Sequence, residues 1–292
     1  MRYAIPDGAV LGLAAVLTGG CAPTTNLLHP TTPRFEGRYA AAAADSSTAA
    51  PLRVVTFNIK LGRRIDRAIE VLRGDSLRDA DVLALEEMDE TGVDRIARTL
   101  GLNYAYYPGV IHPTDNRYFG PAILSRWPIE RSWKLVLPHQ GRWRKQVRTA
   151  TAADLRIHGQ RVRVYAVHLE TQLRISEKDR ADQVLAIARD AADVAGPVVI
   201  AGDFNSYAIG PVLARAGFRW TTEMVGPTIA FFSWDHVFSR GLEEARPSSA
   251  GVVRQVRGAS DHHPVWAVLS LAAPSLAGVA AALPPAAPIE AR

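Results

Sequence analysis

Short runs of apolar residues alternate along the chain with stretches in which apolar residues recur every three or four positions. The first pattern predicts β-strands and the second amphipathic helices, and their alternation is typical of a layered α/β domain. Apolar residues are consecutive at 82–85 and 198–201, which predicts strands buried on both faces. The expected strands are LRVVTFN (52–58), DVLALEE (81–87), GPAILSR (120–126), RVRVYAVHLE (161–170), PVVIAGDFN (197–205), SWDHVF (233–238) and HPVWAVLSL (263–271).

Three helices are expected between these strands. Apolar residues recur with helical spacing over 65–72 and again over 93–100, where Gly101 supplies a C-cap. A longer helix begins after Ser176, which is spaced from Asp179 as in a capping box, and Gly196-Pro197 stops it. We assign the apolar residues of these helices to the core and to no function.

The two ends of the chain differ in composition from the part between them. Residues 1–20 hold a short apolar stretch and are expected to be an export signal, while the small residues before Cys21 resemble a bacterial lipoprotein cleavage site. The alternative is an N-terminus with a chance cysteine. Residues 21–51, rich in Ala, Pro, Ser and Thr, are expected to be a tether, and 272–292 a low-complexity tail. A single domain is therefore expected over 52–271, in a protein that is exported as a periplasmic or cell-envelope lipoprotein, or secreted.

Composition narrows the class of protein further. The chain of 292 residues carries 34 Lys and Arg against 29 Asp and Glu, a net charge of +5, and is 48% hydrophobic. These values argue against a disordered, collagenous or coiled-coil protein. The one cysteine excludes a disulfide framework and a thiolate zinc cluster. A metal site would therefore use oxygen and imidazole ligands.

Polar side chains lie directly after or directly before the apolar strands. Ligands of layered α/β folds bind at strand ends, so we expect these groups to meet in one site. Carboxylate and amide oxygens without thiolate suit a hard ion, Mg²⁺ or Mn²⁺, whereas zinc on the adjacent His262 and His263 is a weaker alternative. The groups are Asn58, Glu86, Glu87, His168, Asp203, Asn205, Asp235, Asp261 and His262.

Seven segments, in this order, resemble the motif set of the endonuclease/exonuclease/phosphatase superfamily. The resemblance implies a four-layered α/β/β/α sandwich of two packed mixed β-sheets flanked by helices. It also implies metal-dependent hydrolysis of a phosphate ester. The segments are TFNIK (56–60), LALEEMD (83–89), GPAILSRWPI (120–129), YAVHLE (165–170), VIAGDFN (199–205), WDHVF (234–238) and SDHHP (260–264).

The resemblance also implies roles for individual residues. Asn58 and Glu87 match the metal-binding pair, and Asp261 matches a further metal-side ligand or hydrogen-bond acceptor. Asp203 and Asn205 match the residues that orient the attacking water and the phosphate. The remaining matches are His168, which hydrogen-bonds the phosphate, the carboxylate–imidazole pair of Asp235 and His262, and Arg148, which contacts the substrate phosphate. Either Asp203 or His262 can be the general base, and we favour Asp203.

Three positions depart from the family pattern. Glu86 stands where many members have Gln, and an added charge there would tighten metal binding or raise a neighbouring pKa. Pro121 stands where Asn is common, so a phosphate contact is lost, and Trp234 replaces an aliphatic residue. None of these changes removes a catalytic group, so we expect an active enzyme.

Basic and aromatic residues near the expected site bear on the class of substrate. The segment RWRKQVR (142–148) mixes bases with an aromatic residue and the pI is near 9.5, which favours a nuclease-like phosphodiesterase acting on nucleic acid. The alternative is a sphingomyelinase-like hydrolase of phospholipid, or a phosphatase of small phosphate esters, with membrane attachment through a lipidated Cys21. A non-catalytic binding module is the least favoured hypothesis. Nothing in the sequence implies a protein partner.

Overall fold

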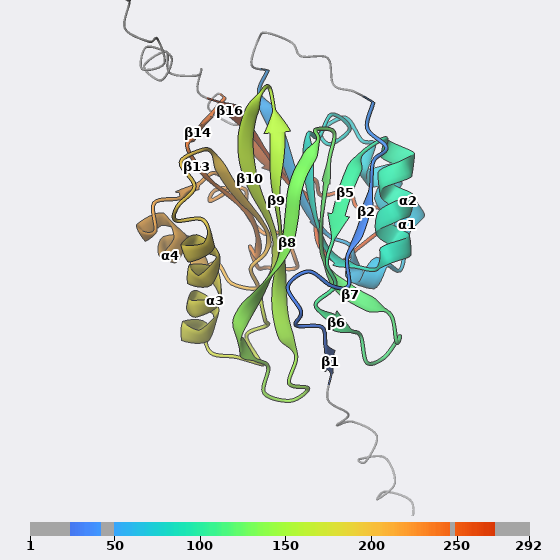
Figure 1. Ribbon diagram of the computed structural model, residues 1–292, viewed down its shortest axis with the longest axis vertical. Helices are drawn as coiled ribbons and strands as arrows, with labels where there is room; N and C mark the ends of the chain where they lie inside the picture. The colour runs from blue at the N-terminus through green and yellow to red at the C-terminus, as the bar shows by residue number, and fades with distance from the viewer. Residues whose placement is uncertain (1–23, 42–49, 246–248, 272–292) are drawn as a thin grey trace, which may run out of the picture.

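A computed structural model describes residues 24–41, 50–245 and 249–271 (Figure 1). Two β-sheets pack face to face and helices cover their outer faces, which confirms the expected four-layered sandwich of two mixed sheets. The proposed export signal, Cys21 and the C-terminal tail lie outside the described residues. Within those residues, no helix is both long and apolar enough to cross a membrane.

The first sheet has ten strands among the described residues. Its centre follows the order β7 (Tyr118–Ser125), β4 (Val82–Met88), β3 (Leu52–Asn58) and β16 (Val265–Leu271). β3 and β4 run parallel, and β16 and β7 pair with them antiparallel. Shorter strands extend it: β1 (Thr25–Asn26), β2 (Phe35–Gly37), β5 (Asn103–Tyr106), β6 (Val110–Ile111), β14 (Leu242–Glu244) and β15 (Ala250–Val252).

The second sheet has six described strands. Parallel strands β10 and β11 lie at its centre, and β13 pairs antiparallel with β11. The register places His168 beside Asp203 and Asp203 beside Asp235, so three candidate site residues are neighbours across the sheet. The strands are, in order, β12 (Arg219–Trp220), β13 (Asp235–Arg240), β11 (Val198–Asp203), β10 (Gln160–His168), β9 (Val147–Ile157) and β8 (Ile129–Gln140).

Three layers of apolar side chains hold the sandwich together. One lies under α1 (Ile65–Leu72) and α2 (Glu90–Leu100), and another under α3 (Glu177–Asp190) and α4 (Ile209–Arg215). The middle layer lies between the sheets, where Val54 and Ala84 belong to the same cluster as Val164 and Ala201. Alternate residues of the central strands thus enter different layers, which explains why their apolar residues are consecutive.

The long hairpin of β8 and β9 was not among the expected strands. β8 is a partly exposed strand in which charged and apolar residues mix, and β9 is rich in Ala and Thr, so neither carries a strong apolar run. The three expected helices are present, and α3 begins with the expected capping box of Ser176 and Asp179. It ends at Asp190, before the expected stop at Gly196-Pro197.

Part of the segment expected to be a tether is folded onto the domain. β1 pairs with β6 and β2 pairs with β5, and the ring of Phe35 packs against those of Tyr106 and Tyr118. The buried Lys134 donates from Nζ to the carbonyl oxygens of Leu27 and Thr32, at 2.7 and 2.9 Å. Residues 24–41 are therefore not a tether as expected. Although the segment has few apolar residues, pairing of its two short strands with the sheet and a few aromatic contacts hold it in a fixed position.

Candidate active site

The ends of the central strands of both sheets border one cleft of about 370 Å³. β4 brings Glu87 to it, β10 His168, and β11 Asp203, while the loop before β16 adds Asp261 and His262. Asn58 and Asp235 lie directly behind these groups, through hydrogen bonds to Asp203 and His262. The structure thus brings together every site residue expected from the sequence, Asn205 and Arg148 included.

The buried pair of His262 and Asp235 forms one side of the site. Nδ1 of His262 lies 2.9 Å from Oδ2 of Asp235, which also accepts a hydrogen bond of 2.5 Å from the Thr228 hydroxyl. Burial alone would lower the pKa of His262, but the carboxylates of Asp235 and Asp203 outweigh it and raise that pKa to about 10. His262 is therefore an imidazolium at neutral pH, and it donates to Asp235.

Asp203 lies at the centre of the site. Its Oδ2 is 3.8 Å from Nε2 of His262 and 3.5 Å from Nε2 of His168, and its Oδ1 accepts from the backbone N–H of Asn205 at 2.8 Å. Burial raises the pKa of Asp203 to about 7 against the opposing charge of His262. A carboxylate with this pKa can accept a proton from water near neutral pH.

His168 differs from His262 in its charge. It is almost fully buried, and burial together with the nearby Arg148 holds its pKa well below the usual value. Its imidazole is therefore neutral at physiological pH. It offers one N–H donor and one acceptor, which suits a hydrogen bond to a phosphate oxygen.

Asn58 and Glu87 form the opposite side of the site. Nδ2 of Asn58 donates to Oδ2 of Asp203 at 3.0 Å and to Oε1 of Glu87 at 3.3 Å, so one amide joins both carboxylates. Glu87 lies at a bulge in β4 with φ of +60°, and Asn205 has φ of +51°. Non-glycine residues rarely adopt such values, and strained backbone of this kind clusters at functional sites.

The donor set fits a hard divalent cation. Carboxylate oxygens of Glu87 and Asp203 both lie within hydrogen-bond distance of the Asn58 side-chain amide, and Mg²⁺ and Mn²⁺ prefer carboxylate and amide oxygens as ligands. Oxygens of Asp203 and Asp235 and a ring nitrogen of His262 also lie within 4.8 Å of one another. Asp261 fits a metal-ligand role less well, because its Oδ2 is paired with Nζ of Lys60 at 2.8 Å at the exposed edge of the cleft.

Glu86, the departure from the usual glutamine, is fully buried. Burial is the main cause that raises the pKa of Glu86 well above the usual range, and the negative charges of Asp235 and Asp203 add to it. Glu86 is therefore a neutral acid. Its Oε1 accepts from the Thr56 hydroxyl, and Oε2 has no hydrogen-bond partner among the described residues. Burial therefore disfavours the added charge that the sequence led us to expect, and a protonated carboxyl has nearly the shape of the glutamine side chain.

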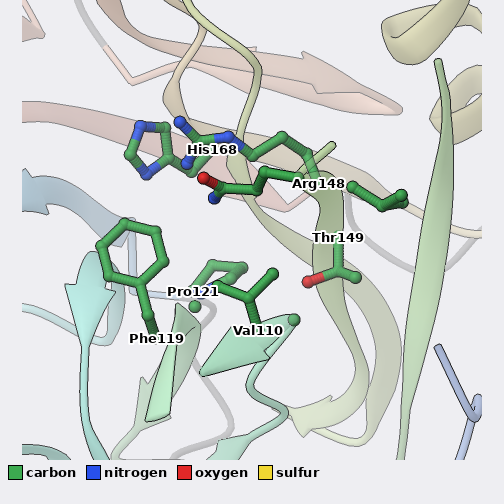
Figure 2. A pocket seen from close by; sticks show the side chains of 10 residues that line it. Val110, Phe119, Pro121, Arg148, Thr149 and His168 are labelled. Carbon is green, nitrogen blue, oxygen red and sulfur yellow. The ribbon is translucent and has the colours of Figure 1, made fainter. Parts of the chain in front are cut away.

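Arg148 lies at one end of the cleft, close to His168 (Figure 2). Its Nη2 donates to Oε1 of Glu170 at 3.1 Å, whereas its Nε and Nη1 have no partner within the part of the chain that is described. A small cavity of about 10 Å³, about the size of one water, lies beside them and is lined by Pro121, Phe119 and Thr149. Arg148 thus retains donors for an anion.

Sequence reasoning missed three residues at the site, Glu170, Arg174 and Thr228. Glu170 is fully buried, and its Oε1 lies 3.1 Å from Arg148 and 3.7 Å from Arg174, so it orients two guanidinium groups at the cleft. Its place in the quoted motif YAVHLE was a usable signal. Thr228, which holds Asp235, lies in an irregular loop whose sequence carries no comparable signal.

A model of the endonuclease/exonuclease/phosphatase family matches residues 55–262, most of the described domain. The chain belongs to this family. Members of the family are generally phosphoester hydrolases and typically depend on a divalent metal. Membership agrees with the clustering of carboxylates and imidazoles at the strand ends.

Individual relatives of the family are distant. A UPF0294 protein of Vibrio cholerae is 28% identical over 133 residues, which are 42% of this chain and 45% of that relative, so the match spans less than half of it. D. rerio TDP2, solved with a single-strand DNA product, has a TM-score of 0.58 at 17% identity and covers 75% of this chain and 98% of its own. Sphingomyelinase C from Streptomyces griseocarneus has a TM-score of 0.55 at 19% identity and covers 76% and 99%. At these identities the two structures show the fold alone.

Proposed function

We propose that this protein is a divalent-metal-dependent phosphodiesterase that uses water as the nucleophile. The proposal rests on the position of Asp203, which lies between a cationic hydrogen-bond donor and a group of metal-binding side chains. The imidazolium of His262 lies 3.8 Å away on one side, and the amide of Asn58 joins Asp203 to Glu87 on the other. A base, a cationic donor and a set of hard-metal ligands therefore converge in one cleft.

In the proposed reaction each residue has a distinct task. Asp203 orients a water and takes its proton, which its pKa of about 7 permits. His262, fixed by Asp235, and neutral His168 donate hydrogen bonds to the phosphate oxygens, and Arg148 adds a charged donor. Glu87 and Asn58 would hold the cation, which when bound neutralises phosphate charge and stabilises the leaving oxygen.

For the substrate we propose a nucleic acid first. Arg148 and Arg174 lie at the cleft, and Arg142, Arg144 and Lys145 precede them on the adjoining loop, which gives a basic track for a phosphate backbone. A phospholipid headgroup is the second candidate, favoured by exposed apolar side chains on the loops that border the same cleft.

The test is a comparison of two substrates under identical conditions. Purified protein is incubated with supercoiled plasmid and, separately, with phospholipid in mixed micelles, in Mg²⁺ or Mn²⁺. EDTA, Asp203→Asn and His262→Ala should abolish the activity, whereas Asp75→Asn, a change at a highly exposed carboxylate, should not. Plasmid nicking that disappears in all three controls supports a nuclease, and phospholipid cleavage alone supports the second candidate. Activity that survives the site variants contradicts the proposal.

A further inference from the structure

Large apolar side chains are exposed on the loops around the cleft. Trp143 is 65% exposed, Leu173 75% and Phe231 92%, and Tyr207 and Phe232 are each about half exposed. Trp143 lies in the loop before Gln146 and Arg148, Leu173 lies between Thr171 and Arg174, and Tyr207 follows Asn205 by two residues. We call Trp143, Leu173, Tyr207, Phe231 and Phe232 the apolar rim.

The loops that carry the apolar rim are joined to one another. The backbone N–H of Arg142 donates to the carbonyl of Arg174 at 3.0 Å, and Nε2 of Gln172 donates to the carbonyl of Asn205 at 3.2 Å. Gln172, Tyr207, Phe231 and Phe232 also line one open hollow of about 510 Å³. The loops that carry the apolar rim are therefore neighbours beside the cleft, whereas isolated exposed apolar residues are common on soluble proteins and need no explanation.

Positive charges accompany the apolar rim. Arg142, Arg144 and Lys145 flank Trp143, and the segment 141–148 contains no acidic residue. Arg174 is next to Leu173. Glu177 is the acid that lines the hollow, and it is paired with Arg180 and accepts from the Ser206 hydroxyl. Exposed aromatic and aliphatic side chains interleaved with Arg and Lys are the composition of a surface that lies on an anionic bilayer.

The described chain begins at this same end of the molecule. The backbone N–H of Thr24 donates to the carbonyl of Arg144 at 2.8 Å, and β1 lies beside the turn that joins β8 to β9 (Figure 1). Cys21 precedes Thr24 by three residues, a distance of at most ~11 Å for an extended chain. A lipid on Cys21, as the sequence leads us to expect, would be attached within reach of the apolar rim.

We propose that the apolar rim docks the protein on the surface of a bilayer that contains anionic phospholipid, whichever phosphodiester the cleft hydrolyses. A base-stacking surface for nucleic acid is less well supported, since Leu173 is aliphatic and the nearly fully exposed Phe231 lies at the turn between Ile229 and Phe232. Docking does not depend on hydrolysis, so it can be tested apart from the proposed function.

The test is co-sedimentation with vesicles of phosphatidylglycerol and phosphatidylcholine in EDTA, with the full chain carrying Cys21→Ser so that no acyl group contributes. We expect the parent to bind, and Trp143→Ala and Phe231→Ala each to lower the partition coefficient about ten-fold. Arg142→Gln should lower it about five-fold. The matched control is Arg78→Gln, because Arg78 is exposed and precedes β4 at the end of that strand opposite Glu87.

The apolar rim residues are exposed, so these variants should keep the parent unfolding transition, which circular dichroism would check. Equal binding by parent and rim variants would overturn the proposal, as would absence of parent binding. It would equally be overturned if the rim variants lost affinity for a single-stranded oligonucleotide while their vesicle binding stayed unchanged.

Discussion

At the scale of single residues, the charge on His262 depends on Asp235. Changing Asp235 to Asn removes the negative charge of the nearest carboxylate, whose Oδ2 lies 2.9 Å from Nδ1, so the pKa of His262 should fall from about 10. We expect kcat to fall by about 100-fold or more, since a misoriented, neutral imidazole loses its contribution to the transition state. Steady-state kinetics across pH would measure it, with Asp75→Asn as the control. Parent activity in the variant would show that this pair has no part in the reaction.

The two central ionisations also set the pH profile. Asp203 must be ionised to take a proton from water, so kcat/KM should rise with pH up to its pKa of about 7, and a bound cation moves this limb lower. His262 must stay protonated, so activity should fall only as pH approaches about 10. The profile is therefore expected to be bell-shaped. Activity that declines between about pH 5 and 8 would reverse the assigned protonation states.

The sequence indicated which residues form the candidate site, but it did not indicate the protonation state of each one. The polar residues at strand ends were identifiable because each lies next to an apolar run, as Asp203 follows 198–201 and His262 precedes 265–269. The neutral state of Glu86 was not, because it depends on burial beside Asp203 and Asp235, which are distant in the sequence. Arg174 was missed for a similar reason, since only the fold brings it to the carboxylate of Glu170.

At the scale of elements, β11 positions Asp203 through a close approach to β10 at Gly202. A Cβ at this position would clash with the carbonyl oxygen of Val167. Gly202→Ala should therefore destabilise the domain by about 3 kcal/mol or more and displace Asp203. Urea denaturation would measure the loss. The control is Gly159→Ala in the β9–β10 turn, where nothing lies within 4 Å and the positive φ costs about 1 kcal/mol. Equal losses in the two variants would contradict the argument.

The sequence predicted the strands that are buried on both faces, but it did not predict a strand in which buried, partly buried and exposed residues are mixed. The expected strand at 52–58 has the same bounds as β3, and the consecutive apolar residues at 82–85 lie within β4. β8 was missed because most of its residues are only partly buried, so packing and pairing with β9 specify it rather than an apolar run.

At the scale of the whole molecule, the segment 24–41 is part of the fold. Deleting residues 1–41 would remove two edge strands and the carbonyls that satisfy the buried ammonium of Lys134. We expect a loss of about 3 kcal/mol or more in the free energy of unfolding, because the truncated chain loses the backbone hydrogen bonds of two strands and the packing of Phe35 against Tyr106 and Tyr118. The measurement is chemical denaturation, with deletion of residues 1–20 as the control. The same stability in both truncations would show that the segment only rests on the surface.

The composition of this segment explains why the sequence did not reveal its role. Residues 21–51 are rich in small and polar residues, and the order of 24–41 comes from pairing with β5 and β6 and from Phe35. The fold class, by contrast, follows from the alternation of strand and helix patterns across the whole domain. Long-range pairing of short segments leaves little trace in local sequence.

The role of Asp203 and a divalent cation is tested most directly by hydrolysis of a simple phosphodiester, bis(p-nitrophenyl) phosphate. Protein freed of metal by a chelator is titrated with Mg²⁺ or Mn²⁺ in this assay. We expect no turnover in EDTA, saturable activation by the cation, and a loss of about 1,000-fold in kcat for Asp203→Asn. Glu87→Gln should raise the cation concentration needed for half-activation, whereas Asp75→Asn should behave as the parent. Turnover at the parent rate in EDTA, or in Asp203→Asn with cation present, would contradict a metal-dependent phosphodiesterase centred on Asp203.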